Sequence, residues 1–217
     1  MNYEIVGSSS KGNCIIVEDV LMLDCGVTYI KIKKYLPKVK LIFISHIHQD
    51  HLLPTTIKKI AYNYPTIKFL TGSKEVVEKL VECGVNKKNI YIVKEGIRYD
   101  LGLLKVRLVY LYHDVENYAL KWQYKDKKGI YIVDTSKVDH IVAQDYDLYL
   151  IENNYQNDLL QEHIDNCEDS NILKYLYRVP DTHLSSEQAN TFLIENMGEN
   201  SRYEYIHQSD YNYKEVD

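Results

Sequence analysis

The stretch Ser45–His51, which reads "SHIHQDH", carries three histidines and an aspartate directly after the apolar run "KLIFI". Imidazole and carboxylate groups crowded at the end of a buried strand are unfavourable through desolvation and through charge repulsion on protonation. His46 and His48 are two residues apart on an extended segment, so their rings point to the same side and can bind one metal ion. Asp50 and His51 follow as the chain turns toward the next helix, where they would face a neighbouring ion. The run predicts a metal site whose other ligands lie elsewhere in the chain.

Three further residues of ligand type each follow an apolar, strand-like run. His113 ends "KVRLVYLY", Asp134 ends "GIYIV" and His207 ends "YEYI". Each of them alone is more typical of an ordinary loop residue, but a site for two ions needs additional nitrogen and oxygen ligands of this kind. Asp134 is the natural bridging ligand, because a carboxylate has two oxygens. The candidate ligands are His46, His48, Asp50, His51, His113, Asp134 and His207.

Short strands and helices alternate in the first half of the chain. The pattern predicts strands in "YEIV", "CIIVE", "VLMLDCG", "KLIFIS", "IKFLTG" and "NIYIV". It predicts a helix over Tyr29 to Leu36 that ends before Pro37, and a second helix with Pro54 in its first turn. A third helix is expected over "SKEVVEKLVECG". These elements place the histidine run between a strand and a helix.

The second half is dominated by longer strands. "GLLKVRLVYLYH", "NYALKWQYK" and "GIYIVDT" read as strands, and the polar turn "DKKG" predicts a hairpin between the last two. "DLYLIEN" and "YEYIHQS" are further strands, and a helical segment is expected from Gln156 to about Tyr177. Ser185 with Gln188 three residues later predicts the capped start of another helix. Strands in both halves with helices between them favour an αββα sandwich of two sheets with outer helices, which is an α/β (α+β) fold.

Composition limits the class of protein. The 217 residues are enough for one substantial core and show no internal repeat or linker, so we expect one domain over residues 1–217. No stretch approaches the roughly 20 apolar residues of a membrane span, and the amino terminus lacks a secretory pattern, which predicts a cytoplasmic protein. The formal net charge of −5 argues against a broad grip on nucleic acid. Lys121, Lys125, Lys127 and Lys128 lie close together, and we interpret them as a solvated hairpin tip rather than a basic mouth.

Several motifs along nearly the whole chain resemble the metallo-β-lactamase-fold hydrolases. "GSSSKGNCIIVE" followed by "LMLDCG" is similar to the opening of the branch that contains small DNA exonucleases and cyclic phosphodiesterases. "YHDVENYAL" and "GIYIVDTS" resemble the third motif and the bridging-aspartate motif of that branch. "LIENNY", "THLSSEQA" and "YIHQSD" resemble its later motifs. The resemblance implies the αββα metallo-β-lactamase fold and a bound pair of metal ions.

The resemblance also implies a role for each candidate residue. His183 matches a histidine that donates a proton in related tRNA-processing and phosphodiesterase enzymes, and Asp24 matches a buried aspartate that steadies the histidine loop. Zinc suits the imidazole-rich ligand set best, with manganese as the alternative. The implied ligands are His46, His48 and His113 for one ion, Asp50, His51 and His207 for the other, and Asp134 between them.

Three functions are compatible with these residues. The first is a phosphodiesterase, in which Asp50 orients a metal-bridged hydroxide and His183 protonates the departing oxygen of a cyclic nucleotide or a nucleic-acid end. The second is a carboxylic ester, lactone or thioester hydrolase on the same fold. The third is a metal-binding regulatory domain without catalysis, which is disfavoured because every expected ligand position is filled. Related small cyclic phosphodiesterases complete their pocket across a homodimer, so the resemblance implies a dimer.

Overall fold

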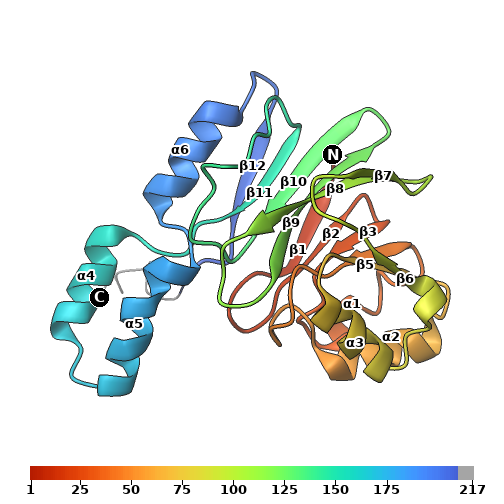
Figure 1. The fold of residues 1–217 in the computed structure, drawn as a ribbon, viewed down its shortest axis with the longest axis horizontal. Coiled ribbons are helices and arrows are strands. Elements are labelled where there is room, and N and C mark those ends of the chain that lie inside the picture. Colours follow the sequence, from red (N-terminus) through yellow and green to blue (C-terminus); the bar gives the residue numbers. More distant parts are fainter. Residues whose placement is uncertain (210–217) are drawn as a thin grey trace.

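The computed structural model describes residues 1–209 and arranges twelve strands in two sheets (Figure 1). The first sheet has the order β1-β2-β3-β4-β5-β6. Its strands are β1 (Tyr3–Gly7), β2 (Cys14–Val17), β3 (Leu21–Leu23), β4 (Leu41–Phe43), β5 (Lys68–Thr71) and β6 (Ile90–Ile92). β1, β2 and β3 pair antiparallel, and β3 to β6 pair parallel, so the sheet is mixed.

The second sheet is also mixed and has the order β12-β11-β10-β9-β8-β7. Its strands are β7 (Arg98–Asp100), β8 (Lys105–Leu111), β9 (Asn117–Tyr124), β10 (Lys127–Ile132), β11 (Leu148–Glu152) and β12 (Arg202–Ile206). β7 to β10 are antiparallel neighbours, whereas β10, β11 and β12 run parallel. The predicted hairpin at "DKKG" is present, because β9 and β10 pair directly across this turn.

The two sheets pack face to face because their strands bury alternate residues. In β8, Val106 and Leu108 point into the space between the sheets, while Lys105 and Arg107 are exposed on the outer face. The first sheet contributes side chains such as Leu23 and Phe43 to the same core. The core between the sheets is thus built from both halves of the sequence, as the sandwich prediction requires.

Helices cover the outer faces of both sheets (Figure 1). On the first sheet lie α1 (Tyr29–Ile32), α2 (Pro54–Asn63) and α3 (Lys74–Glu82), whose apolar residues form one buried cluster with that sheet. α6 (Ser186–Asn196) packs on the second sheet through Ala189, Phe192 and Leu193. The helices α4 (Asn157–Asn166) and α5 (Ser170–Thr182) form a hairpin to one side, and a short 3-10 helix spans Lys87–Asn89. The αββα sandwich is confirmed.

Local signals set most helix boundaries, and two predictions need correction. Pro54 occupies the first turn of α2, and Ser185 and Gln188 form the predicted capping box of α6. The helix expected over Tyr29 to Leu36 is wrong in length, because regular helix ends at Ile32 and no side chain caps its start. The segment from Gln156 to about Tyr177 is two helices, because Asp169 accepts hydrogen bonds from the first backbone N–H groups of α5 and starts a new helix there. Within residues 1–209, no helix combines the length and the apolar character that crossing a membrane requires.

Candidate metal centre

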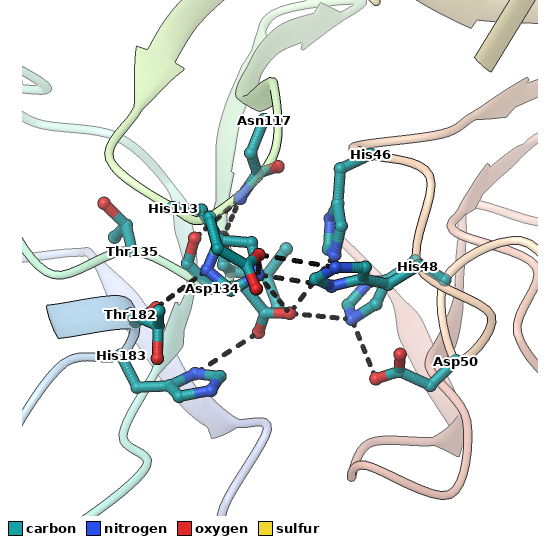
Figure 2. A network of polar contacts seen from close by, with 12 residues as sticks. His46, His48, Asp50, His113, Asn117, Asp134, Thr135, Thr182 and His183 are labelled. Carbon is teal, nitrogen blue, oxygen red and sulfur yellow. Dashed lines mark hydrogen bonds and ion pairs between the residues drawn. The ribbon is translucent and has the colours of Figure 1, made fainter. Parts of the chain in front are cut away.

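All seven predicted ligands meet at one edge of the sandwich, where the loops after β4, β8, β10 and β12 converge. Figure 2 labels five of them, His46, His48, Asp50, His113 and Asp134. They fall into two groups that share Asp134, and in each group one ligand atom from every residue lies within 4.8 Å of the others. The first group is His46, His48, His113 and Asp134, and the second is Asp50, His51, Asp134 and His207. These two groups match the division that the resemblance implies, and a third group of Asp134, Glu152, His183 and His207 overlaps them.

Two rings of the first group meet at a short distance. His113 Nδ1 lies 3.0 Å from the Thr182 carbonyl oxygen, which only accepts, so this nitrogen carries a proton. Asp114 Oδ1 lies 3.3 Å from His48 Nε2 and 3.2 Å from His113 Nε2. His113 Nε2 and His48 Nδ1 are 3.3 Å apart, and which of them donates depends on the tautomer. When neither of these two nitrogens carries a proton, both can bind the same metal ion.

Two buried polar atoms of the first group have no hydrogen-bond partner among the described residues. They are His46 Nε2 and Asp134 Oδ1, and both side chains are almost fully buried. Such unpaired atoms are rare and unfavourable in a folded interior. His46 Nε2 lies 3.4 Å from Asp134 Oδ2, so the unsatisfied nitrogen faces the shared carboxylate. The donor set fits a metal ion that these atoms would coordinate.

The second group surrounds the other side of the Asp134 carboxylate. His51 Nε2 lies 3.1 Å from Asp134 Oδ2 and 3.1 Å from Asp50 Oδ2. His207 Nδ1 is 3.0 Å from Asp134 Oδ1, and its Nε2 is 3.5 Å from Asp50 Oδ2. Two carboxylates and two imidazoles in this arrangement are ligands that suit zinc or manganese.

Asp24 supports the histidine loop through buried hydrogen bonds. Its carboxylate accepts hydrogen bonds from the backbone N–H and the hydroxyl of Ser45, each at 2.8 Å, and from the Tyr131 hydroxyl at 2.8 Å. It also lies 2.6 Å from His51 Nδ1, which fixes the proton on that nitrogen and leaves Nε2 facing the cluster. These contacts match the supporting position that the resemblance implies for Asp24.

A glycine allows the same loop to approach the first sheet. A side-chain carbon on Gly26 would lie 1.6 Å from the backbone oxygen of Asp50, a distance that no packing adjustment could accommodate. Asn13 is buried beside it and donates its side-chain amide to Asp50 Oδ2 at 3.1 Å. The backbone of the Asp50 loop is thus held against the start of the chain.

Glu152 is a buried carboxylate at the site that the sequence reasoning did not single out. Its Oε1 lies 2.6 Å from His183 Nδ1 and 3.2 Å from His207 Nδ1, and its Oε2 accepts backbone N–H groups from Thr135 and Leu184. With both oxygens satisfied by the protein, Glu152 orients the two histidines. An acidic residue closing the apolar strand "LYLIE" was the signal that could have identified it.

Three residues around the cluster adopt left-handed backbone conformations. The φ angles are 56° at Asp24, 49° at Asp134 and 51° at His207. Asn117 supports one of these turns by donating its buried amide to the carbonyl oxygens of Val133 and Asp134 (Figure 2). The turns carry the side chains from the strand ends back toward the cluster.

The charges around the cluster shift the titration of its members. Burial, followed by the charge of His51, holds the pKa of His46 well below its usual value. Burial alone would raise the pKa of Asp134, but the imidazoles of His207 and His51 outweigh it and hold that pKa well below its usual value. Burial disfavours the charged form of His183, but the Glu152 carboxylate outweighs it and raises the His183 pKa. Burial also disfavours the charged forms of His51 and His207, but the Asp134 carboxylate outweighs it and raises the pKa of both rings. Without a bound cation, the surroundings thus favour the neutral form of His46 and the charged forms of His51, His183 and His207.

The cluster opens into a cavity of about 290 Å³. His48, Asp50, His113, Asp134, His183 and His207 line its floor. Helix α5 forms one wall and contributes Tyr175 and Arg178. The Arg178 guanidinium lies 3.4 Å from Asp114 Oδ2, and its side chain is 67% exposed. A small anionic molecule in this cavity could therefore contact the ligand cluster and the Arg178 guanidinium at the same time.

Comparison with known sequences gives partial matches only. No family model matches the chain. The human protein described as inactive cytidine monophosphate-N-acetylneuraminic acid hydroxylase is 36% identical over 101 residues, which cover 45% of this chain and 20% of that protein. The cytidine monophosphate-N-acetylneuraminic acid hydroxylase of Sus scrofa is 33% identical over 106 residues, covering 47% of this chain and 24% of that protein. The match spans about a quarter or less of these curated relatives.

Solved structures match almost the whole chain. The metallo-beta-lactamase fold protein YhfI from Bacillus subtilis has a TM-score of 0.71 at 16% identity and covers 96% of this chain and 86% of its own. The short form of human tRNase Z has a TM-score of 0.67 at 14% identity, with coverage of 97% and 93%. Zn²⁺-bound PqqB from Methylobacterium extorquens also has a TM-score of 0.67, at 11% identity and with coverage of 98% and 90%. At these identities the likeness establishes the fold.

Proposed function

We propose that this chain, which has the metallo-β-lactamase fold, is a metal-dependent phosphodiesterase that hydrolyses a nucleotide or a nucleic-acid end. The observation that carries the proposal is the pair of ligand groups sharing Asp134, with His183 fixed by Glu152 at the same cavity. The relation of human tRNase Z to the same fold supports it, as does the motif resemblance of the sequence.

The two groups would hold one divalent ion each. Zinc is the metal that best suits a ligand set with five imidazoles. When bound, such a pair lowers the pKa of a shared water and neutralises the charge on the phosphate oxygens. The zinc in PqqB is consistent with this choice of metal. Manganese stays the alternative, because each group also contains a carboxylate.

Asp50 and His183 would move protons on opposite sides of the phosphorus. Asp50 Oδ2 lies between His51 and His207 and is part of the cavity wall, so it can accept a hydrogen bond from the attacking water. His183 Nδ1 is bound to Glu152, which leaves Nε2 as the nitrogen able to donate a proton to the leaving oxygen. The same donor would contribute less to hydrolysis of activated esters, so His183 favours phosphodiester over carboxylic ester chemistry.

The proposal is tested with a substrate panel. Cyclic mononucleotides, cyclic dinucleotides, end-labelled single- and double-stranded DNA and RNA, and a carboxylic ester would be assayed with zinc and with manganese. Turnover of a phosphodiester that exceeds turnover of the ester is expected. Hydrolysis of esters, lactones or thioesters alone would contradict the proposal in favour of the second hypothesis. Sedimentation equilibrium of the same protein would test the predicted homodimer.

The metal content is predicted at about two divalent ions per chain, because seven ligands exceed what one zinc ion takes. Elemental analysis after reconstitution with zinc would measure it. His140→Ala, a histidine that contacts the Tyr110 carbonyl outside the cluster, is the control and should leave the content unchanged. A content of one ion or less in the unaltered chain would rule out the dinuclear site.

Arg178→Ala is expected to raise KM for a nucleotide phosphodiester by about tenfold with kcat within about twofold, because one charge-assisted contact to phosphate is lost. Steady-state kinetics on the variant would separate the two constants. Arg178→Lys keeps the positive charge but loses the planar guanidinium group. Its KM should lie between those of the unaltered chain and Arg178→Ala. An unchanged KM in Arg178→Ala would remove Arg178 from the substrate site.

A further inference from the structure

A second group of cations lies on the outer face of the second sheet, at the end of the strands away from the metal centre. It consists of Arg98 on β7, Lys105 and Arg107 on β8, Lys121 on β9, and Lys128 on β10. Together they line a hollow of about 250 Å³, and no carboxylate among the described residues lines it. We call these five residues the cationic face.

The strand register places three of these cations directly opposite one another. Arg98 pairs with Arg107 across β7 and β8, and Arg107 pairs with Lys121 across β8 and β9. Like charges directly opposite each other on a sheet are destabilising. In the part of the chain that the structure describes, none of the three forms an ion pair, and Lys105 reaches Asp100 only at 4.0 Å. In a chain of net charge −5, this row of unneutralised cations is an unfavourable arrangement without an anion.

Lys121 is the cation of the row whose charge is most affected by its surroundings. Its side chain is partly buried, and its Nζ donates to the Val142 carbonyl at 2.6 Å. Burial, followed by the charge of Arg107, lowers the pKa of Lys121 to about 8. An anion placed against the row would reverse this shift.

The cationic face is separate from the catalytic cavity. Helix α6 covers the neighbouring part of the same sheet face, where the outward residues are apolar, including Val109, Ala119 and Ile132. His113 lies six positions after Arg107, which corresponds to roughly 20 Å of extended chain. None of the five cations lines the cavity of the metal centre.

We propose that the cationic face binds the phosphate backbone of a nucleic-acid strand. Three adjacent strands about 4.8 Å apart spread the row Arg98, Arg107 and Lys121 over roughly 10 Å, and a second row with Lys105 and Lys128 lies about two residues further along. Five cations from four strands are more than one phosphate group needs as partners, whereas successive phosphates of one strand can each contact one or two of them. The proposal concerns binding alone and does not depend on the metal centre being catalytic.

The test measures binding of a fluorescein-labelled single-stranded oligonucleotide by anisotropy, in chelator, over a series of salt concentrations. Arg98→Gln/Arg107→Gln is expected to raise Kd at low salt at least about tenfold, and to flatten the slope of log K against log salt by about 1.4, or about 0.7 per phosphate contact. Lys38→Gln/Lys79→Gln removes the same charge from lysines paired with Asp19 and Glu82, and should bind like the unaltered chain.

Thermal unfolding distinguishes a binding role from a structural one. Because the row is repulsive, Arg98→Gln/Arg107→Gln should keep or raise Tm while it weakens binding. A lowered Tm with unchanged binding would make the row structural and overturn the proposal. Equal losses of affinity in both double variants, or binding of anionic lipid vesicles without binding of the oligonucleotide, would overturn it as well.

Discussion

Asp50→Ala is expected to lower turnover of a nucleotide phosphodiester by at least about 100-fold, the lower range for loss of a positioned acid–base group. The variant removes the carboxylate that lies 3.1 Å from His51 Nε2 and 3.5 Å from His207 Nε2. The variant should fold normally, because Asp50 lies in a loop and the substitution changes no side chain of the strands that form the core. Measurement of kcat/KM, together with circular dichroism, would separate the loss of chemistry from a loss of fold.

Asp50 is itself a candidate ligand of the second group, so the controls compare it with residues that would only hold metal and with a carboxylate outside the site. Asp19→Ala removes an exposed carboxylate paired with Lys38 and should leave activity unchanged. His46→Ala and Asp134→Ala should lose metal as well as activity, since both residues belong to the ligand groups. Near-normal turnover of Asp50→Ala would show that the run "HIHQDH" is not catalytic.

His183→Ala is expected to lose far more rate on a nucleotide phosphodiester than on bis(p-nitrophenyl) phosphate. A ribose oxygen leaves poorly without a proton. Removal of the proton donor His183 should therefore lower the rate of nucleotide hydrolysis by about 100- to 10,000-fold, the range for general acid catalysis. Nitrophenolate leaves readily, so its rate should change little. The ratio of the two losses is the readout. Metal content should stay unchanged, because Glu152 holds His183 Nδ1 at 2.6 Å. It is measured together with the rates, since His183 also belongs to a third group that could bind an ion.

Two further variants make the His183 result interpretable. His163→Ala changes a histidine of α4 outside the cavity lining and should affect neither substrate. Glu152→Gln keeps the size of the side chain but removes the charge that orients His183, and should reproduce the substrate dependence in weaker form. Equal losses on both substrates in His183→Ala would assign His183 a positioning role, and loss of metal would make it a ligand.

The sequence predicted what depends on local signals. Alternating burial identified strands such as β8, Pro54 marked the start of α2, and Ser185 with Gln188 marked the start of α6. The convergence of the candidate ligands was predictable because they stand in the loops that follow apolar strands, and strand ends gather at one edge of a sandwich. The resemblance then supplied the pairing into two groups, which spacing alone did not give.

What depends on distant contacts was missed. Glu152 acts through His183 and His207, which lie 31 and 55 residues further along the chain, and no local pattern marks such a partner. The interpretation of the lysines near the "DKKG" turn as a solvated hairpin tip did not include Arg107, because the cross-strand register that sets Lys121 opposite Arg107 is a property of the folded sheet. The short strand β7, which completes that register, was not predicted either.

The left-handed turns at Asp24, Asp134 and His207 carry an evolutionary consequence. For residues other than glycine, this conformation is unfavourable by roughly 1–2 kcal/mol each. A chain selected for stability alone would gain by drifting to glycine or asparagine at such positions. This chain instead has aspartate and histidine there, which tolerate the left-handed region better than most residues but less well than glycine. If the side chains at these positions are kept for the proposed chemistry, a descendant freed from that chemistry should become more stable as the three positions change to glycine or asparagine.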